Sequence, residues 1–118
     1  MALLAVSTAL VATAVTTAAA APAPTSSISL SVSKGASTYN VKKLTAKPGL
    51  IRIDFANNST AAHNVSIEHG GEFEYGATLT IRKGMTTSFL TLAKGTYHLY
   101  SSIGKDEDKG MAATLLVK

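Results

Sequence analysis

The feature that most constrains the fold is a regular alternation of polar and apolar side chains in short runs. Residues 27–33 alternate without a break, and in residues 50–57 the alternation puts Ile51, Ile53 and Phe55 on one face. This period of two is typical of a strand with one buried face. Turn-forming segments such as Lys47-Pro48-Gly49 separate the runs. Further strands are expected over residues 39–44, 63–67, 77–81, 86–92, 96–102 and 113–117.

This pattern predicts the fold class. After the N-terminal segment, apolar residues do not recur at helical spacing, and 118 residues suffice for one domain. We therefore predict an all-β fold, a Greek-key antiparallel β-sandwich of roughly seven or eight strands. Residues 69–75 are expected to form a loop. The rows expected to face inward are Ile51/Ile53/Phe55, Val65/Ile67, Leu90/Leu92, Tyr97/Leu99 and Leu115/Val117.

The N-terminal segment differs from the rest of the chain, because the first charged side chain is Lys34. Residues 1–20 are interpreted as a secretory signal peptide that lacks the usual positively charged start, residues 21–26 as a linker and residues 27–118 as the domain. The alternative is an uncleaved membrane anchor, for which the apolar run is short of the about 20 residues needed. We expect a secreted or periplasmic protein whose mature domain does not insert into a membrane.

Composition excludes several functions. The chain has 11 Lys and Arg against 7 Asp and Glu without a basic run, so nucleic-acid binding is not expected. It has no cysteine, which excludes a disulfide, a thiolate ligand and a cysteine nucleophile. No strand-to-helix elbow activates a serine, so an enzyme is not expected. The acidic run of residues 106–108 is interpreted as a solvated loop, with a site for a hard cation as the alternative.

Several short motifs follow one another along the chain: Ala46-Lys47-Pro48-Gly49, Asn57, His63-Asn64, Gly95-Thr96-Tyr97 and Gly110-Met111. In this order they resemble the motifs of the cupredoxins, the small blue-copper proteins related to plastocyanin and azurin, and the resemblance covers residues 39–118. In the family, the penultimate strand ends in Tyr-x-Phe-Tyr-Cys-Ser-Val, and a loop then reaches Gly-His and Gly-Met. The matching stretch here is residues 97–103, followed by Lys105-Asp106 and Gly110-Met111. The resemblance implies a cupredoxin-like sandwich.

The resemblance also implies where the metal ligands would be. His63 matches the first imidazole and Met111 the axial thioether, while Ser101 stands at the thiolate position and Asp106 at the second imidazole. Asn64 resembles the residue that braces the ligand loops. Serine stays protonated near neutral pH and cannot replace a soft thiolate. The type 1 copper site is therefore predicted to be degenerate.

These observations favour an exported cupredoxin-like protein that acts as a binding or structural module. We expect no cofactor, or copper held weakly as Cu(II), together with a monomeric state and an unidentified protein partner. One alternative is a weak Cu(II) or Zn²⁺ carrier using His63, Asp106 and Met111. Electron transfer through copper, by analogy with the family, is a further alternative. His69 and His98 are expected on the surface, away from the site.

Overall fold

The computed structural model describes residues 22–70 and 73–118. The predicted signal peptide, residues 1–20, lies outside the described residues. Strands and turns make up the described part, and no helix there is long and apolar enough to cross a bilayer. The strands are β1 (Ser26–Val32), β2 (Lys43–Ala46), β3 (Gly49–Asn57), β4 (Ser66–His69), β5 (Phe73–Ala77), β6 (Gly84–Leu92), β7 (Gly95–Tyr100) and β8 (Ala112–Val117).

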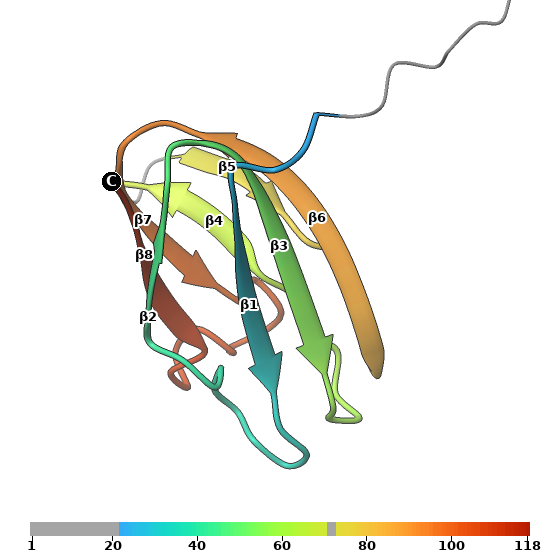
Figure 1. Cartoon of the computed structure of the whole chain (residues 1–118). Helices are drawn as coiled ribbons and strands as arrows, with labels where there is room; N and C mark the ends of the chain where they lie inside the picture. The colour runs from blue at the N-terminus through green and yellow to red at the C-terminus, as the bar shows by residue number, and fades with distance from the viewer. Residues whose placement is uncertain (1–21, 71–72) are drawn as a thin grey trace, which may run out of the picture.

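The strands form two sheets that face each other as a sandwich (Figure 1). One sheet has the order β1-β3-β6 and the other the order β2-β8-β7-β4-β5. The predicted all-β sandwich is confirmed. The sheets are mixed rather than antiparallel throughout, because β1 pairs with β3 and β2 with β8 in parallel. After β1 the chain crosses to the five-stranded sheet, where it forms β2, and then returns to the three-stranded sheet as β3. β1 and β3 therefore run in the same direction.

The core lies between the two sheets. Ile51, Ile53 and Phe55 of β3 are at most 2% exposed, as their spacing predicts, and burying such side chains is the main stabilising contribution. The expected inward rows are buried, except that Leu90 is only partly buried at the margin of the core. The second sheet contributes Ile67, Tyr97, Leu99, Ala113, Leu115 and Val117.

One strand prediction and the adjoining loop prediction are wrong in the middle of the chain. Of the strand expected over residues 77–81, Ala77 ends β5 and Ile81 makes an isolated bridge with His63. β5 itself, Phe73–Ala77, begins inside the loop expected over residues 69–75. Thr78 explains the early end of the ladder. Its backbone amide donates to the Val65 carbonyl, and its Oγ1 accepts from the Val65 amide at 3.0 Å. A side chain thus takes the place of a ladder partner.

The expected strand over residues 39–44 is also shorter than predicted, since β2 begins at Lys43. Tyr39 is buried instead, with its ring edge-on to Phe55 at a centroid distance of 6.1 Å. The segment before β2 thereby closes one end of the core, and its Thr38 lies against Gly110 in the turn before β8.

Candidate functional site

The four candidate ligand positions gather at one end of the five-stranded sheet. His63 precedes β4, Ser101 directly follows β7, and Met111 directly precedes β8. Ser66 pairs with Tyr100, and Tyr100 with Ala112, so these strand ends lie next to one another. Asp106 sits in the turn that joins β7 to β8.

Three of these side chains form one hydrogen-bonded cluster, which we call the triad: His63, Ser101 and Asp106. The Ser101 hydroxyl donates to Oδ2 of Asp106 at 2.7 Å, and Nδ1 of His63 lies 2.7 Å from the same oxygen. An ionised carboxylate only accepts hydrogen bonds, so Nδ1 of His63 carries the proton. The side chains of His63 and Asp106 are 6% and 14% exposed, and Ser101 is buried. The expectation of a solvated acidic run therefore fails for Asp106 and holds for Glu107 and Asp108.

The turn that carries Asp106 is fixed by its own backbone. The Asp106 amide donates to the Ile103 carbonyl, and the Asp106 carbonyl accepts from the Met111 amide at 3.0 Å. The Ser101 amide donates in turn to the Met111 carbonyl at 3.2 Å. Met111 is fully buried and belongs to the core cluster, so its side chain fills space between the turn and the core.

Asn64 joins the His63 segment to the end of β7. Its amide nitrogen donates to the Ser102 hydroxyl and its Oδ1 accepts from the Ser102 amide, each at 2.9 Å. The Asn64 carbonyl accepts a hydrogen bond from the hydroxyl of Tyr39. Burial raises the pKa of Tyr39, and the negative charge of Asp106 raises it further. The Tyr39 hydroxyl is therefore a neutral donor across the ordinary pH range.

Asn57 is a residue whose structural role the sequence analysis did not assign. It is fully buried, and its side-chain amide donates to the carbonyls of Ala61 and Ile81 at 2.8 and 2.7 Å. Its Oδ1 accepts from both the amide and the hydroxyl of Ser59. All the hydrogen-bonding groups of this side chain are used, and they hold the loop that leads to His63. An asparagine at a strand end before turn residues is the signal that could have indicated it.

Three solved structures show what this arrangement is similar to. Auracyanin from the photosynthetic bacterium Roseiflexus castenholzii gives a TM-score of 0.73 at 22% identity, over 82% of this chain and 99% of that chain. Auracyanin A, a blue copper protein from Chloroflexus aurantiacus, gives 0.71 at 17%, over 78% and 98%. Azurin from Methylomonas sp. strain J gives 0.65 at 14%, over 78% and 97%. The chain has the cupredoxin fold.

The predicted cupredoxin-like architecture is thus confirmed at the level of the fold. No model of a protein family and no curated protein matches the sequence. The function must therefore be argued from the site itself.

The site does not fit the type 1 copper centre of blue copper proteins. Such a centre needs two imidazoles and a thiolate, with a weak axial methionine. The chain has no cysteine, and the Ser101 hydroxyl donates to Asp106. In the part of the chain that the structure describes, no group of three or more histidine, cysteine, aspartate or glutamate side chains could hold a metal ion. The soft ligand that copper requires there is missing.

The triad also lacks the geometry of a catalytic serine site. A nucleophilic serine donates to a histidine that a carboxylate orients. Here Ser101 donates to the carboxylate, and His63 bonds the same oxygen from another direction. The residue types are those of a serine hydrolase, but the serine hydroxyl makes no hydrogen bond to the histidine that would activate it.

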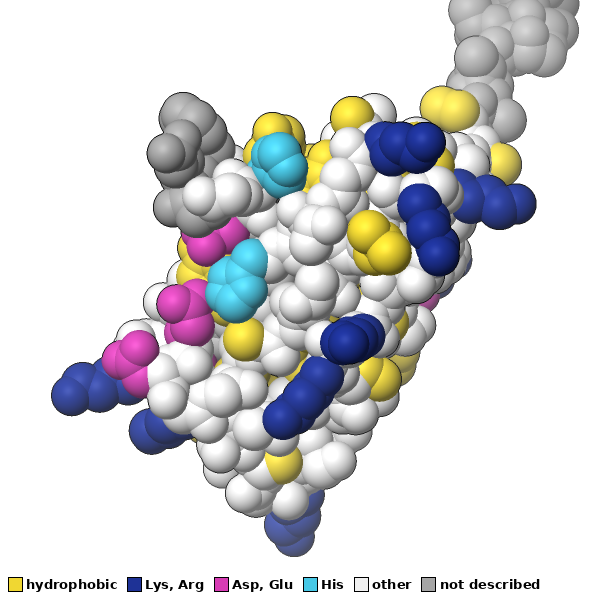
Figure 2. Space-filling view, turned by 90° about the vertical axis from the view of Figure 1, so that its left-hand side faces the viewer, with side chains coloured by type: hydrophobic (Ala, Val, Ile, Leu, Met, Phe, Trp, Pro, Cys, Tyr) yellow, Lys and Arg dark blue, Asp and Glu magenta, His cyan; other side chains and the backbone are white. Residues whose placement is uncertain are grey.

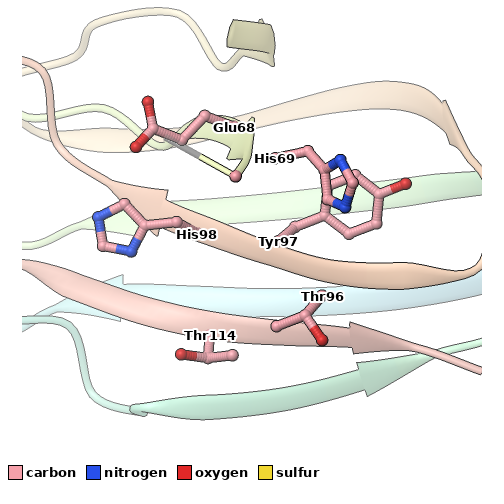
Figure 3. Close-up of a pocket in the computed structure, with 7 residues that line it drawn as sticks. Glu68, His69, Thr96, Tyr97, His98 and Thr114 are labelled. Carbon is pink, nitrogen blue, oxygen red and sulfur yellow. The ribbon is translucent and has the colours of Figure 1, made fainter. Parts of the chain in front are cut away.

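Two shallow hollows of this cupredoxin fold lie away from the triad, on the outer face of the five-stranded sheet. The larger, about 430 Å³, includes Glu68, His69, Tyr97 and His98 in its lining, and Figure 3 shows His98 well apart from the neighbouring rings of His69 and Tyr97. The smaller, about 270 Å³, shares Thr96 and Thr114 with it. Figure 2 looks onto this side and shows histidine and acidic side chains on the left, with a row of cationic side chains to their right.

His98 and His69 take no part in the triad. Nε2 of His98 lies 3.2 Å from a carboxylate oxygen of Glu107, and its ring stacks on Tyr100 at 5.3 Å. The ring of His69 is 5.1 Å from that of Tyr97 at the end of β4. Neither hollow is lined by a residue of the triad.

Proposed function

We propose that the chain is an exported cupredoxin-fold domain that has given up type 1 copper and serves as a binding or structural module. The observation that carries this proposal is the shared oxygen of Asp106, which accepts hydrogen bonds from both Ser101 and His63. These bonds connect the segment before β4 to the turn between β7 and β8. In a metal centre built at these positions, coordination would make the same connection.

The energetics of the triad favour this function. Hydrogen bonds to an ionised group are about twice as strong as neutral ones, and those of the triad are largely shielded from water. A metal approaching Nδ1 of His63 would have to displace both its proton and the Asp106 carboxylate. No catalytic role is proposed, because the Ser101 hydroxyl donates to the Asp106 carboxylate and not to the His63 imidazole that would act as its base.

Export is part of the proposal and rests on residues 1–20, which carry no charge and end in a run of small residues. A module of this kind would act by presenting its surface to another protein outside the cytoplasm.

Copper titration of the purified protein tests the proposal. We expect no intense blue absorption, because thiolate ligation produces that colour and the chain has no thiolate. An azurin loaded in parallel is the positive control. Uptake of one equivalent of Cu(II) with intense blue absorption would contradict the proposal.

A weak Cu(II) or Zn²⁺ carrier is the second candidate, and one observation favours it. The His63 imidazole and the Asp106 carboxylate, two common ligands for these ions, lie 2.7 Å apart. Isotherms for the wild type and His63→Ala decide the matter, with His98→Ala as the control for an imidazole outside the triad. If His63→Ala binds Cu(II) as the wild type does, the carrier function is excluded.

A further inference from the structure

The outer edge of β6 is open. In the order β1-β3-β6 this strand is terminal, and it pairs with β3 over its whole length, from Gly84 to Leu92, without a register shift. Figure 1 shows it at the rim of the sandwich. Alternate backbone groups of a strand point to opposite sides, so about half of those in β6 point away from β3.

Among the described residues, Gly76 of β5 packs against the Leu90 side chain of β6, but no hydrogen bond is made at the outer side of this edge. No backbone hydrogen bond outside the β3 ladder involves a β6 residue. The one side-chain hydrogen bond made by the strand runs inside its own sheet, from the Thr87 hydroxyl to Oδ1 of Asp54 at 2.7 Å. A row of amide and carbonyl groups is thus available for another strand.

The other three sheet edges carry protective features that β6 lacks. On β1, Asn40 bonds both the amide and the carbonyl of Ser31. β2 has four residues, one of them Lys43. β5 has five residues, including Glu74, and lies beside a register shift in β4. Short length, charge and irregularity are the usual means of preventing edge pairing.

The composition of β6 favours pairing. Residues Gly84–Leu92 include neither a charged residue nor a proline, and threonine and apolar side chains dominate. Met85 and Phe89 are 76% and 55% exposed, which is unusual for such large apolar side chains. In β3, the strand next to β6, Nε of Arg52 lies 3.0 Å from Oδ1 of Asp54, so these two opposite charges offset each other.

We propose that β6 pairs in antiparallel fashion with β6 of a second copy of this chain, about a two-fold axis. The three-stranded sheets of the two copies would then form one continuous sheet. A strand without charge does not repel its own copy, and antiparallel pairing of identical strands closes as a dimer. With the axis at Thr87, Met85 stands opposite Phe89 of the partner subunit, so exposed apolar side chains cover each other.

The proposed dimer differs from the monomeric state expected from the sequence, from which strand order and free edges cannot be read. It does not rest on the function proposed for the triad, because no residue of the triad lies on β6.

Analytical ultracentrifugation of the purified protein over a range of concentrations tests the dimer. Phe89→Lys should weaken dimerisation at least about tenfold. The two-fold axis makes the pair of Met85 and Phe89 occur twice in the dimer, so the substitution removes two apolar contacts, and it also places a charge on the edge of each copy. Leu79→Lys is the matched control, because Leu79 is 71% exposed but lies outside β6. Circular dichroism checks that both variants fold.

Hydrogen exchange supplies a readout of the backbone itself. Amides on the free side of β6 should become protected as the dimer forms, and Phe89→Lys should remove this protection. A protein that stays monomeric at all concentrations, a dimer without protection of β6, or equal weakening by Leu79→Lys would each overturn the proposal. Copper titration is independent of these results, so the two proposals can fail separately.

Discussion

Replacing Asp106 by alanine should destabilise the domain, because this one carboxylate holds the triad together. The change removes the acceptor of the Ser101 hydroxyl and of Nδ1 of His63, both at 2.7 Å. A hydrogen bond to a charged group contributes about 1.5–3 kcal/mol, and the two bonds share one oxygen, so their loss is not additive. Since Ser101 is 1% exposed, water cannot readily replace the lost partner. We expect the free energy of unfolding to fall by about 2–4 kcal/mol.

Urea denaturation followed by far-ultraviolet circular dichroism measures this loss. A domain of this size has a total stability of about 5–15 kcal/mol, so the midpoint should move clearly while the slope stays unchanged. Asp106→Asn keeps one acceptor oxygen without the charge and should fall between the wild type and the alanine variant. Asp108→Ala is the matched control, because Asp108 is an exposed acidic residue of the same turn.

The reasoning would be refuted if Asp106→Ala were no more destabilising than Asp108→Ala. Exposed substitutions of the latter kind usually change stability by less than about 0.5 kcal/mol. Equal losses of stability in the two variants would mean that the hydrogen bonds of the triad contribute no stability beyond that of the turn, which its backbone hydrogen bonds already fix.

Three further predictions follow from the same end of the sandwich. The double variant Ser101→Cys, Asp106→His should bind Cu(II) with intense blue absorption, and a colourless, copper-free product would show that the positions are misassigned. Tyr39 has a raised pKa in the folded state, so its contribution to stability is complete below pH 10.0 and is lost as the pH rises further. The free energy of unfolding of the wild type, measured by urea denaturation, should therefore fall more steeply with pH above 10.0 than that of Tyr39→Phe, by up to about 1.4 kcal/mol per pH unit. Parallel pH profiles would contradict this. Asn57→Ala should cost about 2–4 kcal/mol in thermal unfolding, against a small effect of Asn58→Ala at the exposed neighbouring position.

The strands with a clear alternation could be predicted from the sequence, because their side-chain pattern is local. β3 shows this best, since Ile51, Ile53 and Phe55 are buried as their spacing indicates. β5 could not be identified in this way. Its end is set by Thr78, whose hydroxyl oxygen accepts a hydrogen bond from the Val65 amide. That contact depends on the tertiary structure. The parallel pairs likewise depend on the path of the chain between the sheets.

The candidate site was predictable as a set of positions but not as a set of contacts. The resemblance indicated His63, Ser101 and Asp106 as neighbours, and the structure joins them. Composition alone favoured a solvated acidic loop, because three successive acidic residues usually face water. The backbone of the turn instead directs the first of them inward, which no local pattern reveals.

The parallel pairing of β2 with β8 has a consequence for how the domain folds. β8 lies between β2 and β7, and among the strands of residues 22–70 and 73–118 it is the only one that pairs with β2. The five-stranded sheet therefore cannot form completely before residues 112–117 have been synthesised, and Leu115 and Val117 enter the core only then. Contacts between segments so distant in the chain form slowly. A nascent chain of this kind lacks its full core until residue 117 has been synthesised, and an incompletely folded chain is the state in which polypeptides pass through a narrow pore.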